Sequence, residues 1–143
     1  MEWKQVLKED LKRHEGLRLK PYIDSVGVAT IGYGHTYGVR SNDPPITAVA
    51  AEKLLDEDID IAIADARRVV KSFDNLDGPR KTVVANMAFN LGPDRLAQFK
   101  NTIASINAGD YTDASLRMLQ SKWAAQVGQR AKFLSQRMAS GKW

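Results

Sequence analysis

One short segment, residues 21–36, interrupts a chain whose hydrophobic pattern is otherwise helical. Its apolar residues are β-formers, and they are separated by Gly27, Gly32 and Gly34. The β-formers are Tyr22, Ile23, Val26, Val28, Ile31 and Tyr33. Aromatic and β-branched residues broken up by glycines favour short strands joined by tight turns. The segment therefore predicts a small hairpin or meander with bends.

Helical patterns lie on both sides of this segment. Apolar residues at helical spacing from Trp3 to His14 predict an amphipathic helix over 3–14, which Gly16 is well placed to end. Residues 37–46 are rich in glycine, proline, serine, asparagine and aspartate, and predict a loop. Thr47 is then a candidate N-cap for a long helix that runs to about Lys71.

The second half of the chain predicts helices alone. After a break at 74–78, a helix should start at Pro79 and stop at Gly92-Pro93. Three shorter helices should follow, over about 101–108, 112–122 and 129–139, and Asn101 is the candidate N-cap of the helix over 101–108. We therefore expect a mostly α-helical α+β chain forming one domain over 1–143. A small lobe of about 15–60 and a helical lobe of about 1–14 and 72–143 should be joined by a connecting helix of about 48–71.

Composition limits the function. The chain has 143 residues, enough for one hydrophobic core, and no cysteine, which excludes disulfides and thiol chemistry. Charged residues throughout 1–11 predict neither a signal peptide nor a transmembrane helix. The 2 histidines and the scattered carboxylates have no metal-ligand spacing, so we expect neither a metal nor a cofactor.

Charge is distributed unevenly along the chain. Residues 1–65 hold 8 Lys/Arg and 12 Asp/Glu, a net charge of −4, whereas residues 66–143 hold 13 Lys/Arg and 5 Asp/Glu, a net charge of +8. A basic half favours an anionic polymer such as a nucleic acid, a cell-wall polymer or an acidic membrane surface. A solvated basic face explains the same charge equally well.

Three residues around the hairpin suggest a reaction. Glu15 should close the first helix, and Asp24 and Thr30 should lie on the two arms of the hairpin. Cleavage of a glycosidic bond needs a protonated acid and a second carboxylate. Glu15 suits the acid, because partial burial beside an apolar hairpin disfavours its ionised form, and Asp24 in a polar turn should stay ionised. A Thr30 hydroxyl that holds a water beside Asp24 would favour inversion at the anomeric carbon. Ordinary structural roles also exist: a surface glutamate, a turn aspartate and a strand threonine.

The residues around these three resemble a known family. Gly-Leu-Arg-Leu-Lys at 16–20, together with the glycine hairpin, is similar to the active-site region of the phage-type lysozymes. These are the muramidases of the T-even phage and lambdoid endolysin group, glycoside hydrolase family 24. The similarity continues through 86–92, which resembles a helix lining the family's sugar cleft, and through 99–102, 121–123, 129–132 and 141–143; it is weakest over 37–46.

The resemblance implies a two-lobed, lysozyme-like fold with a cleft between the lobes. It implies an endolysin that hydrolyses the β-1,4 bond between N-acetylmuramic acid and N-acetylglucosamine in bacterial peptidoglycan and so lyses the host cell. Carried over by position, Glu15 is the proton donor, Asp24 the second carboxylate and Thr30 the hydroxyl that positions water. Substrate contacts fall on Thr36, Phe89, Thr102 and Arg117. Thr36 stands where an apolar residue is common in the family, and Arg117 where a neutral amide is.

Two further side chains have candidate partners. His35 lacks a serine or cysteine nucleophile, so we expect a structural role, paired with Asp58 or Asp60 on the connecting helix. Arg130 is a candidate ion-pair partner of Glu15 across the cleft, although a basic helix face is an equal explanation.

Other functions remain open at this point. Residues 114–143 carry six Lys/Arg and no acid, which suits a non-enzymatic cationic protein that binds cell walls or disrupts membranes. A hydrolase of chitin-like polymers is another alternative, because N-acetyl recognition is shared. Nucleic-acid binding is the weakest, since no nucleic-acid motif accompanies the charge. We expect a monomer that binds peptidoglycan, with no nucleic acid and no stable membrane insertion. The resemblance suggests that it accumulates in the host bacterial cytoplasm and reaches the wall through a separate pore-forming partner.

Overall fold

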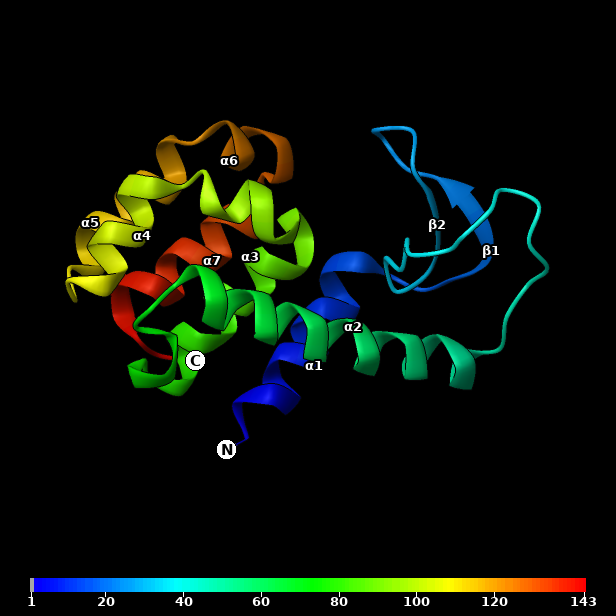
Figure 1. Ribbon diagram of the computed structural model, residues 1–143, viewed down its shortest axis with the longest axis horizontal. Coiled ribbons are helices and arrows are strands. Elements are labelled where there is room, and N and C mark those ends of the chain that lie inside the picture. Colours follow the sequence, from blue (N-terminus) through cyan, green and yellow to red (C-terminus); the bar gives the residue numbers. More distant parts are fainter. Residues whose placement is uncertain (1) are drawn as a thin grey trace.

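The computed structural model describes residues 2–143, and it confirms a mostly helical α+β fold. In chain order the elements are α1 (Trp3–Glu15), β1 (Arg18–Ile23), β2 (Ala29–Gly32), α2 (Ala48–Val69), the 3-10 turn η1 (Phe73–Asn75), α3 (Gly78–Ala97), α4 (Lys100–Asn107), α5 (Tyr111–Gln120), α6 (Lys122–Val127) and α7 (Gln129–Ser140). Figure 1 shows α3 to α7 gathered in one lobe, the β1–β2 hairpin in a second lobe, and α2 running from one to the other. Although α1 is the first helix of the chain, it packs on α3 in the helical lobe.

The two long N-terminal helices end and begin where their sequences indicate. Gly16 ends α1 with a φ of 71°, and its N–H donates to the carbonyl of Lys12. The Thr47 hydroxyl accepts a hydrogen bond from the N–H of Ala50 at 3.1 Å, which confirms it as the N-cap of α2. Ile59 and Ile63 lie off the main apolar stripe of α2 and are nevertheless buried, so this helix buries more than one side.

The hairpin is antiparallel and begins earlier in the chain than its sequence predicts. Tyr22 pairs with Thr30 and Ile23 with Ala29, and the ladder continues to an Arg18–Gly32 pair after a register shift. The predicted start at Pro21 was therefore wrong by three residues, because Gly32 lets β2 pair with a residue ahead of the proline. The loop that follows returns to the hairpin through a hydrogen bond from the N–H of Ile46 to the carbonyl of Leu19.

The prediction for the helical lobe needs three corrections. The helical pattern of α3 stops at Gly92, which has a φ of 76°, but Pro93 begins another turn that continues to Ala97. The N-cap of α4 is Phe99, since its carbonyl accepts the first helical hydrogen bond from Ile103 at 2.9 Å, and Asn101 lies inside the first turn. The third correction is α6, a six-residue helix that was not predicted.

The helical lobe encloses one hydrophobic core. Its largest fully buried side chains include Phe73, Leu7, Leu11, Leu55, Met87, Met118, Leu134 and Met138. Burial of each such side chain contributes about 1.5–3 kcal/mol, so the core rather than helix propensity holds these short helices in place. Within residues 2–143, none of the helices combines the length and apolar character that crossing a membrane requires.

Candidate active site

Glu15 is the last residue of α1, and its carboxylate points towards α7. Its Oε2 accepts a hydrogen bond from Nη1 of Arg130 on α7 at 2.8 Å. The side chains are 18% and 10% exposed, respectively, so this ion pair is largely shielded from water. The predicted pairing of these two residues is confirmed.

On its other side, Glu15 rests against the turn that follows β2. Gly34 has a φ of 72°, and a Cβ at this position would lie 2.5 Å from Oε1 and 2.9 Å from Cδ of Glu15. Both the backbone conformation and the missing side chain are therefore needed. The helical lobe supplies Glu15 and its cation, and the hairpin lobe supplies the surface against which the carboxylate is held.

Asp24 and Thr30 are organised around a single residue, Val28, in the turn between the strands. Oδ1 of Asp24 accepts hydrogen bonds from the N–H groups of Val26 and Val28 at 3.0 and 2.8 Å. The carbonyl of Val28 accepts one from the Asp24 N–H at 3.0 Å and one from the Thr30 hydroxyl at 2.9 Å. The turn role considered for Asp24 is thus present, and it fixes the aspartate and the threonine relative to each other.

Tyr22 lies within electrostatic range of both Glu15 and Asp24, and sequence reasoning missed it. It lies directly across the ladder from Thr30, which is 3% exposed, so the two side chains share a face of the hairpin. The pKa of the Tyr22 hydroxyl is raised, first by burial and then by the negative charge of Glu15. Asp24 raises it further, and only Arg18 opposes. Both carboxylates therefore raise the pKa of the same phenol. The signal in the sequence was the two-residue spacing from Asp24, which places alternate strand residues on one face.

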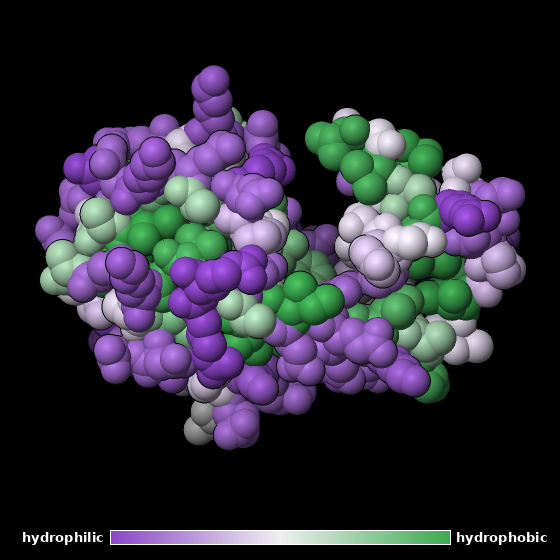
Figure 2. Space-filling model, viewed as in Figure 1, coloured by the Kyte–Doolittle hydropathy of each residue, from purple (hydrophilic) through white to green (hydrophobic). Residues whose placement is uncertain are grey.

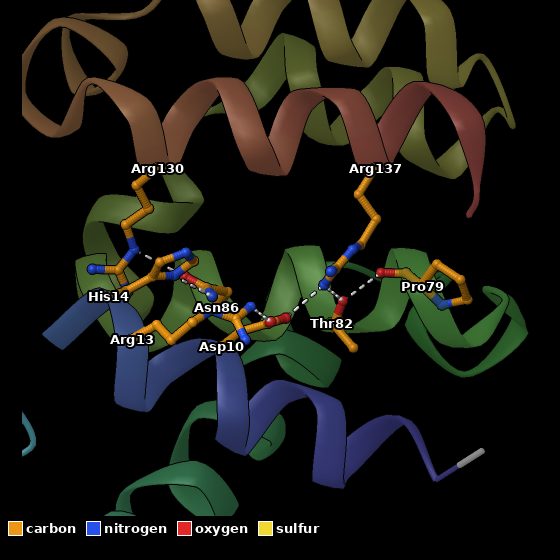
Figure 3. A network of polar contacts seen from close by, with 8 residues as sticks. All are labelled: Asp10, Arg13, His14, Pro79, Thr82, Asn86, Arg130 and Arg137. Carbon is orange, nitrogen blue, oxygen red and sulfur yellow. Dashed lines mark hydrogen bonds and ion pairs between the residues drawn. The ribbon is translucent and has the colours of Figure 1, made fainter. Parts of the chain in front are cut away.

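Behind Arg130, a chain of polar groups crosses three helices. The Arg130 Nε–H donates to Oδ1 of Asn86 on α3 at 3.0 Å, and the amide nitrogen of Asn86 lies 3.2 Å from Nδ1 of His14 on α1. Figure 3 shows these side chains converging between α1, α3 and α7. The pKa of His14 is lowered to about 4 by burial and, next, by the positive charge of Arg130. Sequence reasoning placed His14 only on the apolar side of a helix.

The predicted substrate contacts fall into two separate hollows. Thr36 and Phe89 line a cavity of about 270 Å³ between the small lobe and α3. Thr102 and Arg117 line a larger one of about 640 Å³ within the helical lobe. Thr102 is only 5% exposed, and Arg117 is held by Asp113 through an ion pair of 2.7 Å.

Between the lobes the surface is deeply hollowed, as Figure 2 shows, and apolar side chains gather on the hairpin side of this hollow. Exposed hairpin residues include Ile23, Val26 and Val28.

His35 closes the base of the small lobe onto α2, since its Nδ1 lies 2.7 Å from Oδ2 of Asp58. This confirms a pairing with Asp58 rather than Asp60. Among the described residues, no group of three or more His, Asp or Glu side chains is arranged to hold a metal ion.

A small hairpin lobe, a connecting helix and a helical lobe, with a glutamate between them, form the architecture of a lysozyme-type glycoside hydrolase. Comparison with known sequences agrees: residues 12–140 match the family described as phage lysozyme, and the chain belongs to that family.

Several similar proteins support this assignment. Probable T4-type lysozyme 2 of Dictyostelium discoideum is 28% identical in an alignment that covers 87% of this chain and 88% of that protein. The endolysin of Acyrthosiphon pisum secondary endosymbiont phage 1 is 34% identical, covering 80% of this chain and 74% of its own. The endolysin of Salmonella phage P22 is 35% identical over 73% of both chains.

Proposed function

We propose that this lysozyme hydrolyses the β-1,4 bond between N-acetylmuramic acid and N-acetylglucosamine in bacterial peptidoglycan, and that it acts as an endolysin. The observation that carries the proposal is the placement of Glu15 between the two lobes. It is held by Arg130 on one side and faces, through Tyr22 and Gly34, the hairpin that bears Asp24 and Thr30. Two carboxylates on separate elements suit cleavage of a glycosidic bond.

In the proposed reaction, Glu15 donates its proton to the glycosidic oxygen as the bond to the anomeric carbon breaks. A water held by Asp24 and Thr30 attacks the opposite face of the sugar and gives its proton to Asp24. The Thr30 hydroxyl donates its hydrogen bond to the Val28 carbonyl, so the Thr30 oxygen is left to accept a hydrogen bond from the water. Because water enters opposite the leaving group, the first product carries the inverted, α-configured anomeric centre.

The main alternative was a cationic protein that disrupts membranes through residues 114–143. In the structure, much of the apolar face of this stretch is buried, and the large apolar side chains that stay exposed are Leu116, Leu119 and Trp143. Ala114, Met118, Leu134 and Met138 are each fully buried in the core of the helical lobe. Membrane binding through these buried residues would require the lobe to unfold, whereas wall hydrolysis uses the folded chain.

The decisive experiment compares wild type with Glu15→Gln in a turbidity assay on outer-membrane-permeabilised bacteria. The matched control is Glu57→Gln, because Glu57 is an exposed glutamate on α2. Loss of a general acid lowers the rate by about 10²–10⁴-fold, so Glu15→Gln should nearly abolish clearing while the control retains it. Equal clearing by wild type and Glu15→Gln would refute the enzymatic mechanism and favour membrane disruption.

Product analysis tests the bond and the stereochemistry. Mass spectrometry of released fragments should find N-acetylmuramic acid at the reducing ends; its absence would refute muramidase action. Clearance of chitin oligomers but not of peptidoglycan would favour the chitin-type alternative. Proton NMR during the first minutes should show the α-anomer forming first, and a first-formed β-anomer would contradict the water-positioning role of Thr30.

A further inference from the structure

Arg130 has few partners for a buried cation. Its Nη1 donates to Glu15 and its Nε donates to Asn86, while its Nη2 is buried with no hydrogen-bond partner among the described residues. Apart from Glu15 itself, Asn86 is therefore the one hydrogen-bonding group of the described chain that orients this guanidinium. The position of Arg130, and with it that of the Glu15 carboxylate, depends on how the Asn86 amide is held.

The chemistry of the groups fixes the direction of each hydrogen bond. A guanidinium carries only donors, so Asn86 must present its oxygen to Arg130. Its NH₂ group then faces His14, and an NH₂ group can only donate. Nδ1 of His14, at 3.2 Å, must consequently be an acceptor, which requires a neutral ring with its proton on Nε2. A protonated His14 would oppose the amide with another donor.

The surroundings keep His14 in this neutral form. Asn86 is fully buried, and the edge of the His14 ring meets Phe133 on α7 with 5.3 Å between ring centres. Burial contributes most to the lowered pKa of His14, followed by the positive charge of Arg130; of the other charges nearby, Arg13 and Arg137 lower it and Asp10 raises it. The imidazole is therefore expected to be neutral at pH 7.

We propose that His14 is a positioning residue for Glu15: its Nδ1 holds the Asn86 amide, which fixes Arg130 against the carboxylate. The inference rests on the proton-donor role proposed above for Glu15. Because none of the three residues needs to touch the sugar, loss of the His14 acceptor should lower kcat and leave KM nearly unchanged.

Three variants of the full chain test this. His14→Phe keeps a ring against Phe133 but has no acceptor. His14→Asn restores an acceptor, since its Oδ1 is separated from Cα by as many bonds as Nδ1. Thr82→Val is the matched control: Thr82 is fully buried nearby on α3, bonded to Arg137 and the Pro79 carbonyl, and outside the His14–Asn86–Arg130 chain.

The kinetics are measured below the melting temperature of every variant. We expect His14→Phe to lower kcat about tenfold, as a small misplacement of a reacting group does. His14→Asn should stay within about threefold of wild type, and Thr82→Val should retain wild-type kcat even though it lowers the melting temperature. Any of three results would overturn the proposal: His14→Phe keeps wild-type kcat, His14→Asn is impaired as much as His14→Phe, or Thr82→Val is impaired as much as His14→Phe.

A second measurement does not depend on activity. The 2 histidines of the chain should differ in the protonation of Nδ1 in nitrogen-15 NMR at pH 7. His35 should be protonated at Nδ1, which faces the Asp58 carboxylate, and His14 should be unprotonated at Nδ1. A proton on Nδ1 of His14 would refute the arrangement outright. If Glu15→Gln instead retains full lysis while His14 shows the expected tautomer, the proposed function fails and the hydrogen-bond chain stands as a structural feature only.

Discussion

The buried ion pair between Asp10 and Arg137 offers a sharp test of what holds the helical lobe together. Asp10 on α1 is 2% exposed and Arg137 on α7 is 6% exposed, and Nη1 of the arginine lies 2.6 Å from Oδ2. Arg13 contacts the other carboxylate oxygen at 2.5 Å, but its side chain is 62% exposed. Figure 3 shows the aspartate between these two arginines. The two contacts of Asp10 therefore differ in solvation rather than in geometry.

Removing Asp10 leaves a cation in the core. Nε of Arg137 is already buried with no hydrogen-bond partner among the described residues, and after Asp10→Ala its Nη1 keeps only the Thr82 hydroxyl. Breaking a buried pair from one side costs about 3–5 kcal/mol. Arg13→Ala removes a partner that solvent already screens, which costs less than about 1 kcal/mol. In a chain of this length the first change lowers the melting temperature by about 10 °C, and the second by about 2 °C.

Urea unfolding followed by circular dichroism measures both effects. With a slope of about 2 kcal/mol per molar, Asp10→Ala should move the midpoint down by about 2 M. The double variant Asp10→Leu/Arg137→Met should recover most of the loss, because well-packed apolar residues replace a buried pair at little cost. A loss below about 1 kcal/mol for Asp10→Ala, or an equal loss for Arg13→Ala, would refute this reasoning.

Two further predictions concern the site. Gly34→Ala should lower kcat about 10–100-fold, because the added Cβ displaces Glu15. Gly38→Ala is the control: Gly38 has the same φ of 72°, so the variant has the same backbone strain of about 1–2 kcal/mol, but no atom lies within 4 Å of the added Cβ and kcat should be retained. Equal kcat in both variants would show that the close approach to Glu15 is unimportant. The second concerns pH: the pKa of His14 is lowered from 6.5 to about 4, so the unfolded chain takes up a proton that the folded chain does not. Stability that is intact above pH 6.5 is therefore lost as the pH falls towards 4, by about 1–2 kcal/mol once the incomplete burial of the ring is allowed for. The difference between wild type and His14→Phe in unfolding experiments across this range measures it, and parallel curves would contradict the shift.

Most elements that depend on residues close to one another in the sequence were predicted correctly. The Thr47 cap, the stop at Gly16 and the paired strands around Val28 all depend on neighbouring residues, and all were visible in the sequence. Helix α6 was missed because six residues make fewer than two turns, too few for a period to show. Its sequence signal is the Ser121 hydroxyl, which accepts from the N–H of Ala124.

The site was less predictable because its parts are distant in the chain. The pairing of Glu15 with Arg130 was only a candidate ion pair, because a basic helix face explained Arg130 equally well. Nothing local indicated that Asn86 would join Arg130 to His14, because an asparagine in a helix is usually explained by solvent or a cap. The predicted contacts at Thr102 and Arg117 also lie apart from those at Thr36 and Phe89, a separation that only the packing of α3 to α5 sets.

The partners of α1 also have a consequence for biosynthesis. Asp10 and Arg137 are separated by 127 residues, and Glu15 and Arg130 by 115. A chain emerging from the ribosome therefore carries its first helix without either arginine until α7 has followed. The charges of Asp10 and Glu15 must stay in water until then, because burying an unpaired carboxylate is unfavourable. Closure of the helical lobe and placement of the proposed proton donor are thus both deferred until α7 has been synthesised, which ties the onset of the proposed wall-degrading activity to completion of α7.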